Sequence, residues 1–176
     1  MQNIMIDIET LGTSSNSVLL SIGAVEFDGE KLGKEFEVFI DPESCTDHGL
    51  VIDARTVMWW LGQSDAARSG LLKRKGVPLD EAMVKLHNAF DWKGKQVWCN
   101  GTDFDFPIIS SACKAVGVSD PWQYWAKMDY RTLKNLLPKK TFSELQVKPD
   151  VAHSALSDAK AQALSCINIL KFLGGE

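Results

Sequence analysis

Apolar residues in the first forty positions follow the pattern of β-strands. Residues 3–7 are apolar and β-branched, and a longer apolar run covers residues 18–27. Asp28 and Gly29 form a strong hairpin signal, and apolar and polar residues then alternate over residues 36–40. Together these segments predict a sheet that begins with three antiparallel strands.

The rest of the chain predicts helices separated by short strands. Asp53 and Ser64 are suited to cap helices that run to Trp60 and Leu72, and Pro78 opens a third helix. Residues 96–100 predict a short strand, and further helices are expected from Pro107 to Val116, over 132–137 and over 154–173. Strands first, then helices mixed with short strands, indicate an α/β fold with a mixed sheet flanked by helices.

The final predicted helix has apolar positions at helical spacing. Leu156, Ala163, Ile167 and Leu170 are expected to face inward, and Gly174 is expected to end the helix.

Two acids stand in the first predicted strand, in the segment D-I-E-T-L-G of residues 7–12. Residues two apart in a strand point to the same face, so Asp7 and Glu9 present adjacent carboxylates. Adjacent like charges are unfavourable unless a cation neutralises them, and Mg²⁺ prefers oxygen ligands of this kind. A solvated strand face is the alternative interpretation of this pair.

A second acidic segment, N-G-T-D-F-D-F-P, covers residues 100–107 at the end of a predicted strand. Functional groups are commonly placed at such strand ends in α/β folds. Asp103 and Asp105 would face the same way if the segment is extended, so spacing does not choose between them. Asp105 can equally serve as the N-cap of the following helix.

The third segment, H-S-A-L-S-D, covers residues 153–158 at the start of the last predicted helix. Asp158, in the first turns of the helix, can complete a carboxylate cluster. His153 can reach the same site from the helix entrance. A lone histidine is usually structural, and its combination with the acids is what favours a functional role.

These three segments, in this order and spacing, resemble the sequence motifs of the DEDDh 3′–5′ exonucleases. The resemblance spans nearly the whole chain. Residues 56–64 (T-V-M-W-W-L-G-Q-S) and 129–133 (D-Y-R-T-L) are similar to a narrower group within that superfamily. It contains the phage and prophage exonucleases of the exonuclease VIII-like set and a related bacterial exoribonuclease.

The resemblance implies a ribonuclease H-like fold, with a mixed five-stranded sheet, and a set of roles. Asp7, Glu9, Asp105 and Asp158 are expected to bind two Mg²⁺ ions, for which Mn²⁺ can substitute, and His153 is expected to be the general base. The chemistry agrees, because two cations can activate water, stabilise the leaving oxygen and offset charge on the phosphate. Histidine titrates near neutral pH and can accept the proton of that water.

The resemblance also implies a pocket for the 3′-terminal nucleotide, formed in part by Thr10 and Leu11. Trp59 and Trp60 are about 100° apart on a predicted helix, so one is expected in the core. The other is free to stack on a base, with a dimer contact or ordinary packing as the alternatives.

Asn100 and Arg131 are further candidate substrate contacts in the similar segments. Asp129 and Arg131 are suited to orient a substrate phosphate, and a surface ion pair is an at least equal alternative for them.

The formal net charge of −4 does not exclude a nucleic-acid partner, because two bound divalent ions would leave the protein near neutral. The four cysteines form no C-x-x-C pair and predict reduced, partly buried thiols. The first fifteen residues contain acids where a signal peptide would be apolar, and no apolar run reaches membrane-spanning length. The sequence therefore predicts a cytoplasmic protein without a membrane partner.

The predicted function is metal-dependent 3′–5′ hydrolysis of single strands or 3′ overhangs, by a single exonuclease domain over residues 1–176. DNA and RNA both remain open as substrates, and a homodimer is expected from the resembling exoribonucleases. Two alternatives compete with this function. A non-catalytic nucleic-acid-binding domain is disfavoured because no ligand of the pattern is missing. A haloacid-dehalogenase-type phosphatase is disfavoured because the second acid is Glu9 and no suitable later acidic pair with lysine follows.

Overall fold

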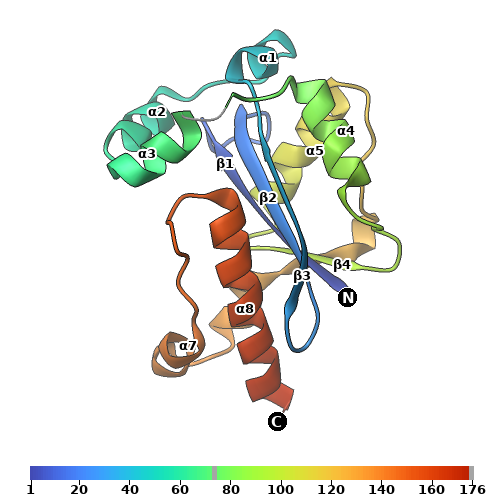
Figure 1. Ribbon diagram of the computed structural model, residues 1–176, viewed down its shortest axis with the longest axis vertical. Coiled ribbons are helices and arrows are strands. Elements are labelled where there is room, and N and C mark those ends of the chain that lie inside the picture. The colour runs from blue at the N-terminus through green and yellow to red at the C-terminus, as the bar shows by residue number, and fades with distance from the viewer. Residues whose placement is uncertain (73–74, 175–176) are drawn as a thin grey trace.

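The computed structural model describes residues 1–72 and 75–174, and its centre is a five-stranded sheet in the order β3-β2-β1-β4-β5 (Figure 1). Strands β1 (Asn3–Thr10), β2 (Leu19–Phe27) and β3 (Leu32–Phe39) are antiparallel neighbours. Strands β4 (Gln96–Cys99) and β5 (Lys127–Asp129) extend the sheet in parallel with β1. The prediction of a mixed sheet with three antiparallel strands first is confirmed.

Eight α-helices and one 3-10 helix surround the sheet in the described part of the chain. They are α1 (Pro42–Asp47), α2 (Ala54–Leu61), α3 (Asp65–Leu72), α4 (Leu79–Ala89), α5 (Asp105–Ala115), η1 (Tyr124–Ala126), α6 (Tyr130–Asn135), α7 (Lys139–Leu145) and α8 (Ala155–Gly174). The predicted caps are confirmed. Asp53 accepts a hydrogen bond from the Arg55 backbone at 2.8 Å, and Ser64 accepts one from the Ala67 backbone at 3.3 Å.

The helices pack on the sheet in two layers. Helices α4 and α5 cover one face, where residues such as Ile6, Met83 and Phe106 form a wholly apolar core. Helix α8 runs across β1, β2 and β3 on the other face (Figure 1). There a second apolar core, which includes Met5 and Ala163, occupies the part of the interface away from the start of α8.

Several short elements were not predicted from the sequence. Helices α1, α7 and η1 and strand β5 are three to seven residues long, which is too short for a clear apolar period. Helix α6 begins two residues before the predicted start. Leu170 does not face inward, since it is 39% exposed, whereas the neighbouring Ile169 is buried and lies on the covered face of α8.

None of the helices in the described part of the chain combines the length and the apolar character that a bilayer crossing demands. All four cysteines are free and buried, as their scattered positions predicted.

Candidate active site

Strand β1 carries Asp7 and Glu9 on the sheet face that α8 covers. Side chains alternate along a strand, so Ile4, Ile6 and Ile8 point to the opposite face, where each is at most 5% exposed. This apolar row fixes the rotation of β1, and the two carboxylates therefore project toward α8.

Helix α8 brings Asp158 to the same place. Gly23 lies opposite Asp7 in the β1–β2 register, and a Cβ atom at this position would collide with the Leu156 backbone at the start of α8. Glycine thus permits the helix to approach the sheet directly beside Asp7. One ligand oxygen from each of Asp7, Glu9 and Asp158 lies within 4.8 Å of the others, and these three residues are called the carboxylate cluster below.

Asp105 is a close neighbour of the carboxylate cluster but does not belong to the group within 4.8 Å. It is the first residue of α5, it is 3% exposed, and its charge helps to raise the pKa of both Asp7 and Glu9. Asp103 is exposed instead. The two acids do not share one direction, because the segment is not extended: the chain turns there, with a hydrogen bond from the Phe104 amide to the Gly101 carbonyl.

Burial is the main cause of raised pKa values at all four acids. It raises the pKa of Glu9 to about 8, with further contributions from the charges of Asp158 and Asp105. Burial likewise raises the pKa of Asp105 to about 7, although hydrogen bonds oppose it, and it raises the pKa of Asp158. The pKa of Asp7 lies well above its ordinary value, because burial and the neighbouring carboxylates act together. Such a set of buried like charges favours binding of a cation.

Gln162 holds the carboxylate of Asp7. Its Nε2 donates a hydrogen bond of 2.8 Å to Asp7 Oδ1, which lowers the pKa of Asp7 against the other effects. Gln162 follows Asp158 by four residues on α8, so both side chains lie on one helix face. Its Oε1 is buried and has no hydrogen-bond partner within residues 1–72 and 75–174.

His153 lies beside the carboxylate cluster, just before α8. Its backbone has a positive φ of 62°, and its ring packs edge-to-face against Trp59 and Trp60 at centroid distances of 5.0 and 6.0 Å. Hydrogen bonds from the backbone at His153 and Ser154 to Asp158 connect the helix entrance with the cluster. The imidazole is thus held by aromatic contacts on α2 and by the first turn of α8.

A cavity of about 540 Å³ adjoins the carboxylate cluster at the end of β1. Glu9, Thr10, Trp59, Trp60 and Phe104 are among its walls, and the Trp60 indole donates a 2.8 Å hydrogen bond to the Thr10 carbonyl. Trp60 is 7% exposed and Trp59 is 46% exposed, so the prediction that one of the pair belongs to the core is confirmed. We call this space the Thr10 cavity.

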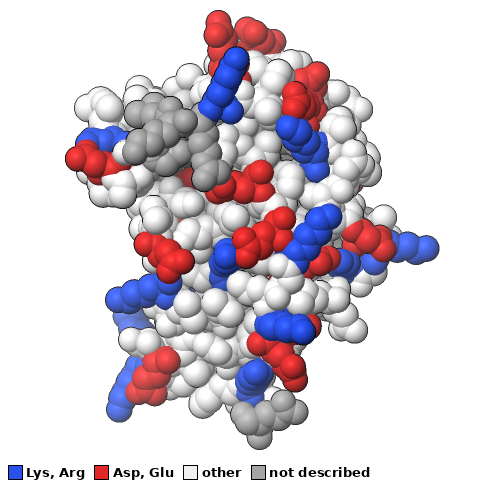
Figure 2. Space-filling view, viewed as in Figure 1, with Lys and Arg blue, Asp and Glu red and all other residues white. Residues whose placement is uncertain are grey.

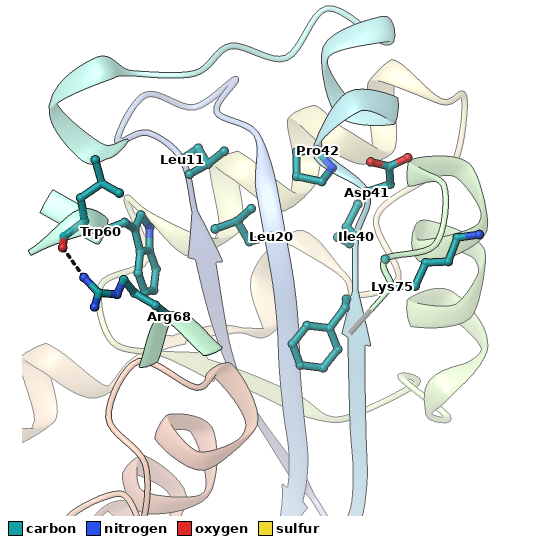
Figure 3. A pocket seen from close by; sticks show the side chains of 11 residues that line it. Leu11, Leu20, Ile40, Asp41, Pro42, Trp60, Arg68 and Lys75 are labelled. Carbon is teal, nitrogen blue, oxygen red and sulfur yellow. Dashed lines mark hydrogen bonds between the residues drawn. The ribbon is translucent and has the colours of Figure 1, made fainter. Parts of the chain in front are cut away.

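A second cavity of about 490 Å³ shares Trp60 with the Thr10 cavity as a lining residue (Figure 3). Leu11, Leu20, Ile40 and Pro42 line it, and the Arg68 guanidinium at its rim donates a hydrogen bond to the Leu61 carbonyl. None of the four acids is among the described residues that line it. Leu11 belongs to this cavity and not to the Thr10 cavity, which separates the two residues expected to share one pocket.

Asn100 and Arg131 meet at the carboxyl ends of β4 and β5. Arg131 Nη2 donates a 2.7 Å hydrogen bond to the Asn100 carbonyl, and Lys134 Nζ donates a 3.2 Å bond to Asn100 Oδ1. The charge of Arg131 lowers the pKa of Asp105, which shows that these groups are near the acids.

Sequence reasoning missed Gly23, Phe104, Lys134 and Gln162 as parts of this site. For Gln162 a signal exists, namely its spacing of four residues from Asp158 on one helix. The other three depend on contacts between segments that are far apart along the chain.

Comparison with known proteins places this geometry in a family. Residues 2–170 match the family model described as the 3′–5′ exoribonuclease Rv2179c-like domain. The exodeoxyribonuclease of Enterobacteria phage T4 is 25% identical over 215 residues, an alignment that covers 99% of this chain and 92% of the phage protein.

Solved structures with the same fold include exonuclease I of E. coli in its zinc-bound complex with single-stranded DNA. Its TM-score is 0.72 at 14% identity, and the match covers 99% of this chain and 41% of that one. Exonuclease I of Methylocaldum szegediense gives a TM-score of 0.68 at 14% identity, with 99% and 41% covered. The chain thus spans about two fifths of the length of these exonuclease I chains, and the likeness concerns the fold. The chain therefore belongs to the Rv2179c-like 3′–5′ exoribonuclease domain family and is a 3′–5′ exonuclease of ribonuclease H-like fold.

Proposed function

We propose that this exonuclease hydrolyses single-stranded DNA or RNA, or 3′ overhangs, from the 3′ end and releases 5′-mononucleotides by a two-metal-ion mechanism. Asp7, Glu9, Asp105 and Asp158 would hold the ions, which we take to be Mg²⁺ with Mn²⁺ as a substitute. The observation that carries the proposal is the carboxylate cluster, whose three ligand oxygens lie within 4.8 Å of one another.

The donor set fits a hard divalent cation. All candidate ligands are carboxylate oxygens, and the pKa of each acid is raised mainly by burial, which the nearby hydrogen bonds and charges offset only in part. When bound, such ions supply positive charge at the phosphate and at the attacking and leaving oxygens. Gln162 would keep Asp7 in the orientation that binding requires, as hydrogen-bond partners of metal ligands commonly do.

His153 is the group in this site best placed to accept a proton from the attacking water. It adjoins Asp158 through the helix entrance, and Trp59 and Trp60 restrict the position of its ring. An imidazole held beside the carboxylates is suited to act as a general base.

The Thr10 cavity is the proposed place of the 3′-terminal nucleotide. It borders Glu9, it is large enough for a nucleoside, and its aromatic walls offer ring faces for stacking. Trp59 contributes a half-exposed indole there, whereas Leu11 lines the neighbouring cavity.

The names of the relatives refer to both RNA and DNA. The family model is described as exoribonuclease, the phage relative as exodeoxyribonuclease, and exonuclease I has been solved with dA16 and dT13 oligonucleotides. Both polymers therefore enter the test.

Digestion of 5′-labelled single-stranded DNA, single-stranded RNA and duplexes with 3′ overhangs, in Mg²⁺ and in EDTA, tests the proposal. The expected result is a ladder of shortening products in Mg²⁺ and no products in EDTA. Full activity in chelator, or internal fragments as the first products, would contradict it. Binding without cleavage of any substrate would favour the non-catalytic alternative.

A single exonuclease domain, a homodimer and a cytoplasmic location remain predictions. Sedimentation equilibrium of the purified chain checks the homodimer.

A further inference from the structure

Two cations lie together at the carboxyl ends of β4 and β5, next to the acidic site. Arg131 and Lys134 are separated by three residues along the α6 segment, so they lie on one face of the helix. Both donate to Asn100, one to its carbonyl and one to its side-chain oxygen. The Lys134 ammonium also lies 5.7 Å from the centroid of the Tyr130 ring.

The hydrogen-bond partner that Arg131 and Lys134 share is neutral. The ion pairs found within the described ranges involve other residues, and Asn100 offers only uncharged oxygens. Asp129 is the nearest acid in the sequence, but its carboxylate accepts hydrogen bonds from the Arg131 amide and the Thr132 hydroxyl as the helix cap. Burial and the charge of Arg131 lower the pKa of Lys134, while Asp129 opposes this. Arg131 also acts on Asp105, whose pKa its charge lowers, but neither cation forms an ion pair within the described ranges, and two adjacent cations favour an anion.

Gly101 leaves the space in which the Arg131 guanidinium lies. A Cβ atom on Gly101 would stand 2.9 Å from Arg131 Cζ, and the residue has a φ of +119°, which favours glycine. The backbone that leads from β4 to Asp105 is therefore shaped to receive Arg131. Gly101 belongs to the same turn that places Asp105 in the site and leaves Asp103 outside it.

Local cations matter because the face of the molecule in Figure 2 carries no continuous basic belt. Lysine and arginine side chains are interspersed there with acidic ones, and the net charge is −4. An anionic polymer that approaches four carboxylates needs positive groups close to the site.

We infer that Arg131 and Lys134 form a binding site for a backbone phosphate of the substrate strand, on the 5′ side of the scissile bond. The inference rests on the proposed function, because the scissile phosphate is taken to lie at the carboxylate cluster and the terminal nucleoside in the Thr10 cavity. The pair lies on α6 and contacts Asn100 just after β4, whereas the cavity is lined by residues of β1 and α2 and by Phe104. The next phosphates of the strand are then the anions within reach. A phosphate contact carries no information on the 2′-hydroxyl, so it serves DNA and RNA alike.

The test is the double variant Arg131→Met/Lys134→Met, with Lys139→Met/Lys140→Met as a control that removes the same charge from α7. Figure 1 shows α7 beside the far part of α8, away from the helix start. The first variant should lower kcat/KM on oligonucleotides by roughly 10–100-fold, the scale expected when charged hydrogen bonds are removed. The slope of log kcat/KM against log salt concentration should shrink by about 0.7 for each phosphate that the variant no longer neutralises. The control should match the wild type in both.

Oligonucleotides with one uncharged methylphosphonate at the second, third or fourth linkage from the 3′ end locate the phosphate. At one linkage the substitution should slow the wild type and have no further effect on Arg131→Met/Lys134→Met. Equal sensitivity of wild type and variant at all three linkages would overturn the inference. If the wild type degrades no oligonucleotide, the proposed function itself fails. Mn²⁺ affinity, measured by electron paramagnetic resonance, should be unchanged in the variant, and a weaker affinity would also count against a phosphate contact.

Discussion

The two faces of strand β1 bury very different groups. Toward α4 and α5 it presents Ile4, Ile6 and Ile8, which pack into a continuous apolar core. Toward α8 it presents Asp7 and Glu9, whose own burial raises their pKa values. Burial of the isoleucines therefore stabilises the fold, whereas burial of the two acids destabilises it.

The apolar face of β1 explains how the fold tolerates the buried acids on the opposite face. Like charges in a buried position destabilise a fold, and they persist where the surrounding structure holds them firmly. The apolar face supplies that support, so substitutions on the acidic face should change metal binding and hydrolysis more than they change folding. Four predictions test this statement, beginning with the largest effect.

Asp105→Asn should nearly abolish hydrolysis, with a decrease beyond the roughly 10–100-fold typical of residues that only orient a metal ligand. Its carboxylate is buried beside the carboxylate cluster, whereas that of Asp103 is exposed. Turnover of a 5′-labelled oligonucleotide and Mn²⁺ affinity measure the effect.

Asp103→Asn is the matched control and should retain a substantial fraction of activity, while circular dichroism should show both variants folded. An inactive Asp103→Asn beside an active Asp105→Asn would mean that the two acids were assigned the wrong way round.

His153→Ala should lower kcat by roughly 10²–10⁴-fold, the scale expected when a general base is removed. Metal affinity should survive, because the ring is proposed to contact water and not metal. His87→Ala, at an exposed position of α4, controls for removal of an imidazole. Near-normal turnover of His153→Ala would remove the residue from the mechanism.

Gln162→Leu should weaken divalent-ion affinity by about 10–100-fold, because Asp7 loses the hydrogen bond that orients it. Asn168→Leu is the control on the same helix, since its amide donates to the Leu145 carbonyl and not to an acid. Calorimetric titration with Mg²⁺ measures the affinity of both variants, and only Gln162→Leu should bind more weakly than the wild type. Equal affinities would show that Asp7 needs no orientation by α8.

The smallest effect concerns stability against pH in EDTA. The pKa of Glu9 is about 8 against an ordinary 4.5, and that of Asp105 is about 7 against 3.8. The folded protein therefore binds more protons than the unfolded chain between these values, so stability should fall as the pH rises from about 4 to about 8. Thermal melts in EDTA and in Mg²⁺ measure this, and the fall should be smaller in Mg²⁺.

Glu9→Gln removes one of these charges and should raise Tm in EDTA at pH 8, at about 2–4 °C per kcal/mol. Glu144→Gln, exposed on α7, should leave it unchanged. A Glu9→Gln protein no more stable than the wild type would show that the buried charge has little cost.

Local patterns predicted most of the sheet and the larger helices. The alternation in β1 was sufficient to place Asp7 and Glu9 on one face, and Asp53 and Ser64 indicated where α2 and α3 begin. Helix α7 was missed because none of its residues is fully buried, and β5 because it is three residues long. Leu170 was misplaced because Ile169 and Leu170 are both apolar neighbours, and periodicity did not show that Ile169 is the one on the covered face.

The assembly of the site lay beyond local patterns. Gln162 and Asp7 are 155 positions apart, and Lys134 and Asn100 are 34 apart. The turn between Asp103 and Asp105 depends on Gly101, whose conformation is coupled to Arg131 on another element. Such contacts are set by the packing of whole elements, which periodicity and propensity do not determine.

The direct contact of α8 with Gly23 has a consequence for the chain during its synthesis. Strand β1 carries its two acids within the first ten residues, but Asp158 and His153 arrive with the last helix. A ribosome that adds about 5–20 residues per second therefore exposes a nascent chain without a complete carboxylate set for several seconds. Until α8 docks, a growing copy of the protein lacks part of its proposed catalytic site.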